Sequence, residues 1–287
     1  MKAALAITAA ICGLLITAGV LVGSLLRPHP APFVARTVSV TGIQPLDDNA
    51  SAGRVVFTFD DGPDVYTPAL LAEMKRLHLR GVFFVFGVKA RAHPQLIREE
   101  AADGDLVENH TYSHASFTGA STDTPPLSAA EIKSELVSTQ QAIVAAGAPK
   151  PTLYRAPFGD ITAADNAIAA KLGLRTVQPF SVVPDGNIVD SRDWTGISAA
   201  QIAHDVEYGY RAKQGKLPGL AQGARVIGFH DSAPECQQQP VLCGYMVNTI
   251  KSLPLIVAWM NRHNLGVTTV VPANATGGAV PNLAVSK

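Results

Sequence analysis

The chain has 287 residues, of which 47% are hydrophobic and 16% charged, and its formal net charge at pH 7 is zero. This composition supplies enough apolar residues for one sizeable core, and the length suits a single large α/β domain. The neutral balance, without long runs of like charge, excludes a basic nucleic-acid-binding surface, so nucleic acid is not expected as a partner.

Residues 1–26 are predicted to be a targeting segment. Lys2 is followed by an almost uninterrupted apolar run from Ala3 to Leu26. The run exceeds the usual core of a signal peptide and is long enough to span a bilayer, which favours a membrane anchor over a cleaved signal peptide. Either alternative places the rest of the chain outside the cytoplasm, secreted or anchored. We expect a monomer that contacts the membrane only through this segment.

The remaining chain divides into three parts by composition. Residues 27–52 are rich in proline and small polar residues, which prevent a long helix and indicate a spacer. Residues 53–272 are predicted to form the folded domain, and residues 273–287 a flexible C-terminal tail.

Within the domain, strand and helix patterns alternate. Strands are expected at 55–59, 82–86, 105–109, 151–154, 174–180, 224–231 and 265–271, and helices at 67–81, 93–104, 128–147, 162–173, 199–215 and 245–264. The first helix is predicted to have Thr67 as its N-cap, Pro68 at its first position and Gly81 as its terminator. Ser128 and Glu131 predict a capping box at the start of the long third helix.

The strands are short continuous apolar runs, and a helix follows almost every one. This order indicates a mostly parallel sheet that is covered on both sides. Seven or eight such units in a domain of this length favour a barrel of the α/β class over an open sheet.

Polar residues follow the predicted strands at the ends where a β/α barrel carries its chemistry. Asp60 and Asp61 follow the strand at 55–59, and "HTYSH" (110–114) follows the strand at 105–109. Arg155 follows the strand at 152–154. His230 and Asp231 end the strand at 224–231, and "DSRDW" (190–194) lies in the long segment after Phe180. These side chains are therefore expected on one rim.

Two histidines and one carboxylate are a common ligand set for a catalytic divalent metal, with the open position left to water or substrate. His110, His114 and one aspartate of the pair at 60 and 61 fit this set. Zinc is the simplest choice, and cobalt, manganese and nickel accept the same ligands. The other aspartate would remain as a general base, and the residue pattern alone does not decide which of the two it is.

Five motifs in chain order, "TFDDGP", "HTYSH", "RAPFGD", "DSRDW" and "GFHD", resemble those of the polysaccharide deacetylase (NodB-homology) family, carbohydrate esterase family 4. The similarity runs from Val55 to Val271. The resemblance implies a distorted (β/α)7 barrel and the metal-dependent removal of acetyl groups from polysaccharides.

The resemblance also implies roles for the residues around the metal. Asp60 matches the family's general base, and Arg155 matches the arginine that holds this base in place. Asp61 matches the metal ligand that acts together with His110 and His114.

Further roles concern the groove and the leaving group. Pro157 and Phe158 match residues that line the groove, and the N–H of Phe158 matches a donor to the tetrahedral oxyanion. Asp193 matches the carboxylate that tunes the catalytic histidine, and Trp194 the adjacent groove wall. His230 matches the general acid that protonates the leaving group.

One position departs from the family pattern. The last motif of the family is usually Leu-x-His, in which the leucine forms part of the pocket for the acetyl methyl group, whereas this chain has Gly228 there. Either Ile227 or Phe229 refills the space, or the acyl pocket is wider and the substrate altered.

The polar loop "PECQQQPVLCGY" carries Cys236 and Cys243. In an oxidising compartment these residues are expected to form a disulfide, with two free thiols as the alternative. A cysteine-rich metal site is disfavoured, because Cys12 in the apolar segment is the only other cysteine.

The resemblance, together with the apolar segment at the N-terminus, implies a hydrolase that removes acetyl groups, N-acetyl before O-acetyl, from an extracytoplasmic polysaccharide such as peptidoglycan or a chitin-like glycan, with xylan less favoured. Two alternatives remain: a metal-dependent hydrolase of a small amide or ester, and a non-catalytic glycan-binding scaffold on the same fold.

Overall fold

The structure is a computed structural model that describes residues 53–177, 188–212, 215–232 and 244–269. The predicted targeting segment, the spacer, the C-terminal tail and the pair Cys236 and Cys243 lie outside the described residues, and these assignments stay predictions. None of the helices in the described part of the chain is both long enough and apolar enough to cross a bilayer.

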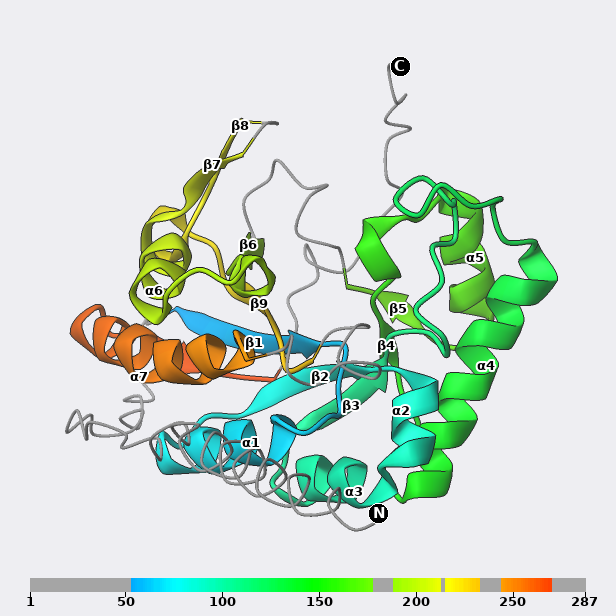
Figure 1. The fold of residues 1–287 in the computed structure, drawn as a ribbon, viewed down its shortest axis with the longest axis horizontal. Coiled ribbons are helices and arrows are strands. Elements are labelled where there is room, and N and C mark those ends of the chain that lie inside the picture. Colours follow the sequence, from blue (N-terminus) through cyan, green and yellow to red (C-terminus); the bar gives the residue numbers. More distant parts are fainter. Residues whose placement is uncertain (1–52, 178–187, 213–214, 233–243, 270–287) are drawn as a thin grey trace, which may run out of the picture. The chain divides into compact units, whose positions relative to one another are not determined.

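A parallel sheet forms the centre of the domain (Figure 1). Its strands are β1 (Arg54–Asp60), β2 (Gly81–Val85), β3 (Leu106–Asn109), β4 (Leu153–Tyr154), β5 (Arg175–Thr176), β6 (Ile188–Asp190), β9 (Val226–His230) and β10 (Gly266–Val267). The strand order is β5-β4-β3-β2-β1-β9-β6, and β10 pairs with β1. Every pairing among these strands is parallel, as the alternating pattern predicted.

The two faces of the sheet bury different side chains. Val55, Phe57 and Phe59 of β1 point into the main core, to which the helices contribute, whereas Val56 belongs to a smaller cluster inside the sheet. This inner cluster contains side chains from β4 and from β6, which lie near opposite ends of the strand order. The sheet therefore curls around it, which is the distorted barrel that the sequence predicted.

Seven helices are present among the described residues: α1 (Thr67–Arg76), α2 (Gly87–Ala92), α3 (Pro94–Ala102), α4 (Ala129–Ala146), α5 (Ala163–Lys171), α6 (Ala199–Tyr208) and α7 (Met246–Arg262). In Figure 1, α1, α3 and α7 lie along one face of the strands. The predicted capping box of α4 is confirmed: the Ser128 hydroxyl accepts from the Glu131 N–H, and the Glu131 carboxylate accepts from the Ser128 N–H.

The predicted limits of the first helix are wrong. Tyr66 occupies the N-cap position of α1, and Thr67 is already helical. The helix ends at Arg76, because His78 adopts a left-handed φ of 55° and turns the chain towards β2. Gly81 is the first residue of β2 and terminates no helix.

The predicted helix at 199–215 is also too long. α6 ends at Tyr208, where Gly209 adopts a φ of 70° and its Cα lies so close to the backbone of Leu217 that a Cβ would overlap the carbonyl oxygen. After it, β7 (Tyr210–Ala212) and β8 (Gly215–Leu217) form an antiparallel pair, visible beyond α6 in Figure 1. The sequence pattern did not predict this pair, the short helix α2 or the three-residue strand β6.

Candidate active site

The predicted polar residues meet at the carboxyl ends of the strands. Asp60 ends β1 and His230 ends β9, and these two residues are register partners. His110 follows β3 and Arg155 follows β4, so parallel pairing brings both to the same rim. Asp193 lies in a 3-10 turn, η2 (Asp193–Thr195), that follows β6.

Three side chains form a group with the composition of a metal site. The ligand atoms of Asp61, His110 and His114 all lie within 4.8 Å of one another. Asp61 Oδ1 is 3.2 Å from His110 Nε2 and 3.4 Å from His114 Nε2. The side chains are buried, with exposed fractions of 7%, 3% and 9%.

The hydrogen bonds leave acceptor atoms facing one another in this group. His110 Nδ1 lies 2.8 Å from the carbonyl oxygen of Arg155, which only accepts, so Nδ1 carries the proton. In the neutral ring, Nε2 is then an acceptor that faces the Asp61 carboxylate. Asp61 Oδ1 is buried and has no hydrogen-bond donor among the described residues. Such an arrangement is stable only with a proton or a cation in its centre, so these residues fit a divalent metal.

The pKa shifts are consistent with this arrangement. Burial lowers the pKa of His114 to about 4, although the neighbouring Asp61 carboxylate acts in the opposite direction. Burial by itself would raise the pKa of Asp61, but His114 and His110 outweigh burial and hold that pKa below its usual range. At neutral pH the group therefore offers one carboxylate and a neutral imidazole at His114, the forms in which these residues bind metals.

The adjacent Asp60 has a different partner. Arg155 Nη1 donates to Asp60 Oδ1 at 2.7 Å and to Thr58 Oγ1 at 2.9 Å. The guanidinium of Arg155 also lies over the ring of Phe84, 4.4 Å from its centroid. Both charged side chains are almost fully buried. Asp60 is thus held by a fixed positive charge and lies next to the three-residue group.

His230 lies beside Asp60 on the neighbouring strand β9 and is paired with Asp193. His230 Nδ1 is 2.8 Å from Asp193 Oδ1, and the His230 N–H donates to Asp193 Oδ2 at 2.8 Å. Thr249 on α7 donates to the same oxygen at 2.8 Å. Burial alone would lower the pKa of His230, but the Asp193 carboxylate raises it to about 10. His230 is therefore an imidazolium ion over the physiological pH range and can donate a proton.

Two exposed aromatic side chains lie next to these groups. Phe158, in the 3-10 turn η1 (Pro157–Gly159), is 46% exposed, and its ring centroid lies 4.5 Å from that of His114. Trp194 in η2 is 54% exposed. The adjacent Pro157 is buried beneath the turn. Phe158 also has a φ of 58°, an unfavourable value for a residue with a side chain, and such values often mark functional sites.

Gly228 faces the inside of the curled sheet. Its register partners are Thr58 on β1 and Asp190 on β6, so a side chain here would point to the same face as theirs. Ile227 and Phe229 point to the opposite face and pack in the main core, where Phe229 stacks on two phenylalanines of β1. The prediction that either of them refills the space is therefore wrong.

Several supporting residues were not found from the sequence. Glu135 on α4 accepts hydrogen bonds from the N–H groups of Tyr112 and Ser113, and so holds the loop between the two histidines. Thr249 on α7 and Lys89 on α2 also support site residues. Nothing in their local sequence signals these contacts, because each depends on packing between distant segments.

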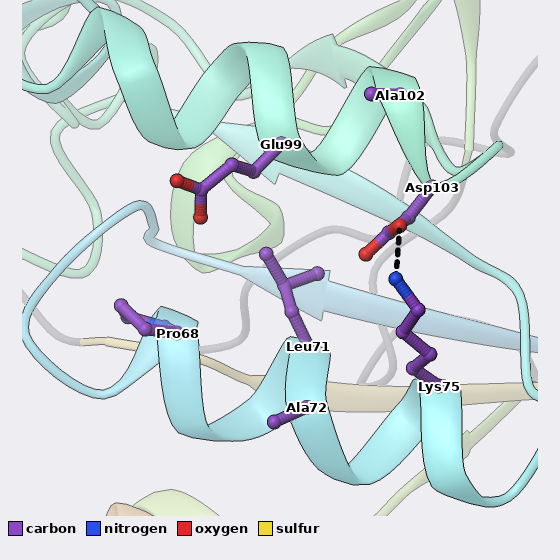
Figure 2. Close-up of a pocket in the computed structure, with 7 residues that line it drawn as sticks. All are labelled: Pro68, Leu71, Ala72, Lys75, Glu99, Ala102 and Asp103. Carbon is purple, nitrogen blue, oxygen red and sulfur yellow. Dashed lines mark hydrogen bonds and ion pairs between the residues drawn. The ribbon is translucent and has the colours of Figure 1, made fainter.

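A surface groove lies elsewhere, between α1 and α3 (Figure 2). Lys75 and Asp103 form an ion pair across it at 3.5 Å, and the side chain of Lys75 is 73% exposed. None of the residues that line this groove belongs to the predicted site.

Comparisons with known proteins identify the family of the chain. Residues 47–177 match the family model described as polysaccharide deacetylase. The chitooligosaccharide deacetylase of a Bradyrhizobium species is 31% identical over 224 residues, which cover 77% of this chain and 90% of that protein. The peptidoglycan-N-acetylglucosamine deacetylase of Bacillus cereus is 31% identical over 154 residues, 53% of this chain, and this chain spans only 50% of its length.

A solved structure is similar as well. The family 4 carbohydrate esterase from Streptomyces lividans, in complex with acetate, is 30% identical and aligns with a TM-score of 0.61, covering 81% of this chain and 100% of that chain. The chain therefore belongs to the polysaccharide deacetylase (NodB-homology) family, carbohydrate esterase family 4, and the two relatives above are named as deacetylases of peptidoglycan N-acetylglucosamine and of chitooligosaccharides. The fold class and the family predicted from the five motifs are confirmed.

Proposed function

We propose that this protein is a metal-dependent hydrolase that removes acetyl groups, N-acetyl before O-acetyl, from a polysaccharide outside the cytoplasm. Peptidoglycan and chitin-like glycans are the favoured substrates, as expected from the sequence, and relatives named for both match the chain. One observation carries the proposal: a proton donor at His230 and a carboxylate at Asp60 lie on the same rim as the three metal-binding side chains.

The metal would be held by Asp61 Oδ1, His110 Nε2 and His114 Nε2. Zinc is the proposed ion, and cobalt, manganese and nickel accept the same donor atoms. When bound, a divalent cation at this position supplies Lewis acidity towards water and the acyl carbonyl.

The residues of the chain then divide the proton transfers between them. Asp60, whose Oδ1 is fixed by Arg155, accepts the proton from the attacking water as general base. The N–H of Phe158 donates to the oxyanion that develops on the acyl group. His230 donates a proton to the leaving amine or hydroxyl, and Asp193 keeps the ring oriented and protonated.

The aromatic side chains at the rim suit a sugar. Phe158 and Trp194 are exposed beside the proposed catalytic groups, and aromatic faces of this kind commonly pack against sugar rings. We propose that they bind the glycan. The extracytoplasmic location rests on the apolar segment of residues 1–26.

A second candidate function is hydrolysis of a small amide or ester. The inner-face position of Gly228, with no side chain where the family usually has leucine, favours it, because an acyl pocket without this wall is less restrictive. In that case the polymer would not be the preferred substrate.

Acetate release from a panel of substrates tests the proposal. Peptidoglycan, chitooligosaccharides, acetylated xylan and an aryl acetate are incubated with the protein, with and without a metal chelator. We expect release from N-acetylated glycans that the chelator abolishes and added zinc restores. Chelator-insensitive release would contradict the metal assignment, and turnover of the aryl acetate alone would favour the small-substrate alternative. Absence of both metal and turnover would indicate a scaffold.

A further inference from the structure

Lys89 on α2 is a buried lysine that the proposed chemistry does not use. Its side chain is 2% exposed. Its ammonium nitrogen lies 2.8 Å from the carbonyl oxygen of Asp61, 2.6 Å from Ser232 Oγ and 3.1 Å from Asp64 Oδ2. A lysine ammonium has three N–H donors, and these three acceptors among the described residues lie within hydrogen-bonding distance of it.

The partners of Lys89 lie just beyond the two strands that carry the catalytic groups. Asp61 is the first residue after β1, and Ser232 is the second residue after β9. The Ser232 hydroxyl also donates to Asp64 Oδ2 at 2.8 Å. A single ammonium thus links the segments through which the chain leaves β1 and β9.

The backbone of Asp61 needs support of this kind. Its φ is 77°, in the left-handed region that is unfavourable for a residue with a side chain. Its N–H donates to the carbonyl of Phe84 at 3.2 Å, and its own carbonyl accepts from Lys89. These two bonds stabilise the conformation in which the Asp61 carboxylate points towards the two histidines.

The histidines are supported from the same place. The Lys89 ammonium lies 5.0 Å from the ring centroid of Phe86, within the range of a cation–π contact. The Phe86 ring in turn packs on both imidazoles, with centroids 5.6 Å from His110 and 4.6 Å from His114. Lys89 therefore supports all three proposed metal ligands. It binds the backbone of Asp61 directly, and it contacts the ring that packs on the two histidines.

A simpler role for Lys89 would be to neutralise the buried carboxylate of Asp64 and nothing more. That role requires the ion pair and nothing else. The hydrogen bond from Lys89 to the Asp61 carbonyl neutralises no charge. If Lys89 and Asp64 are made neutral together, no buried charge of the ion pair is left uncompensated, and the loss of this hydrogen bond can be measured separately.

We propose that Lys89 is a positioning residue of the metal site, which fixes the Asp61 backbone and thereby sets the affinity and the coordination geometry of the bound cation. This inference rests on the proposed function, because it takes Asp61, His110 and His114 as the metal ligands.

The double variant Lys89→Met/Asp64→Asn tests it, because both charges disappear at nearly constant volume while the Asp61 carbonyl loses its donor. The matched control is Lys75→Met/Asp103→Asn, the same chemical change at the exposed ion pair in Figure 2. Zinc affinity is measured by competition with a chromophoric chelator, and the coordination geometry by the visible absorption spectrum of the Co²⁺-loaded protein. Circular dichroism verifies folding.

The double variant is expected to bind zinc about 10–100-fold more weakly and to show an altered Co²⁺ spectrum, while the control matches the wild type. If the double variant does not fold, Ser232→Ala, which removes one hydroxyl from the same ammonium, is expected to weaken zinc binding about threefold or more.

The inference would be overturned, and the metal site left intact, if the double variant binds zinc within about twofold of the wild type and has an unchanged Co²⁺ spectrum. The same result for Ser232→Ala, where that variant is used instead, would also overturn it. Failure of the wild type itself to bind zinc would overturn the metal site of the proposed function, and the inference with it.

Discussion

Asp60 and Asp61 are adjacent in the chain and lie in opposite electrostatic environments. Both are nearly buried, with side-chain exposures of 4% and 7%. Asp60 is bound by the guanidinium of Arg155 at 2.7 Å, a positive charge that the chain itself supplies. Asp61 instead faces two imidazole nitrogens at 3.2 and 3.4 Å, and no described donor binds its Oδ1. Asp60 therefore has its counter-charge within the chain, whereas in the proposed function the counter-charge of Asp61 would come from a bound cation.

Replacement of the metal-facing carboxylate should give the largest effect. We expect Asp61→Asn to lower chelator-sensitive acetate release by at least about a hundredfold, because an anionic ligand is lost. In the metal-free protein the free energy of unfolding should fall less than in Asp60→Asn, because Asp61 has no guanidinium partner and an amide N–H can donate to an imidazole. Urea unfolding in the presence of chelator measures the second effect, and a loss of stability as large as that of Asp60→Asn would contradict the account.

Replacement of the arginine-bound carboxylate should affect stability more strongly. Asp60→Asn should reduce turnover by about 10²–10⁴-fold, the usual contribution of a general base. It should also lower the free energy of unfolding of the metal-free protein by about 3 kcal/mol, because the buried Arg155 loses its carboxylate. Equal unfolding midpoints for the Asn variants at 60 and 61 would show that the two environments do not differ as described.

The pair of Asp193 and His230 makes a prediction about pH. The carboxylate raises the pKa of His230 to about 10, so the wild type should retain its proton donor until the pH approaches that value. In Asp193→Asn the pKa should fall towards about 6.5, and the alkaline limb of the kcat/KM profile should move to lower pH. Thr249→Val, which removes only a neutral donor to Asp193, is the control and should shift the limb much less.

The same pair contributes to stability with a defined sign. Because the folded-state pKa of His230 lies above the unfolded value, the stabilisation is complete below about pH 6.5 and is lost as the pH rises towards about 10. The Asp193→Asn variant should therefore differ most from the wild type in unfolding midpoint near or below neutral pH. A difference that grows at alkaline pH would contradict the ion pair.

The smallest effect is expected at Gly228, whose register partners are Thr58 and Asp190. If the missing side chain widens the acyl pocket, Gly228→Leu should disfavour acyl groups larger than acetyl by about tenfold or more relative to acetyl. Turnover of acetyl, propionyl and butyryl derivatives of one amino sugar measures this preference. Unchanged activity and unchanged acyl preference would refute the wider pocket.

The sequence predicted well what depends on strand ends. Parallel strands bring their carboxyl ends to one edge, so residues such as Asp60, His110 and His230 could be placed together from chain order alone. The residue pattern could not decide which of the two aspartates faces the two histidines. That distinction arises from the left-handed φ of Asp61, a local turn that no periodicity reveals.

Contacts between distant segments were not predictable. Lys89 has the sequence appearance of an ordinary helix lysine, yet its side chain is buried beneath Asp61. Glu135 lies on α4, whose sequence pattern indicates only an amphipathic helix. The carboxylate of Glu135 nevertheless holds the loop between His110 and His114. The pair β7 and β8 was missed because Gly209 ends α6 through a close backbone approach, which depends on the tertiary fold.

The zinc content of three purified proteins, the wild type, Asp60→Asn and Asp61→Asn, tests the division between the two aspartates most directly. After equilibration with the same limiting free zinc and removal of unbound ion, elemental analysis gives the zinc bound per chain. We predict that the wild type and Asp60→Asn retain zinc stoichiometrically, whereas Asp61→Asn loses most of it. Equal zinc content in the two variants would contradict the assignment of Asp61 to the metal and of Asp60 to the proton.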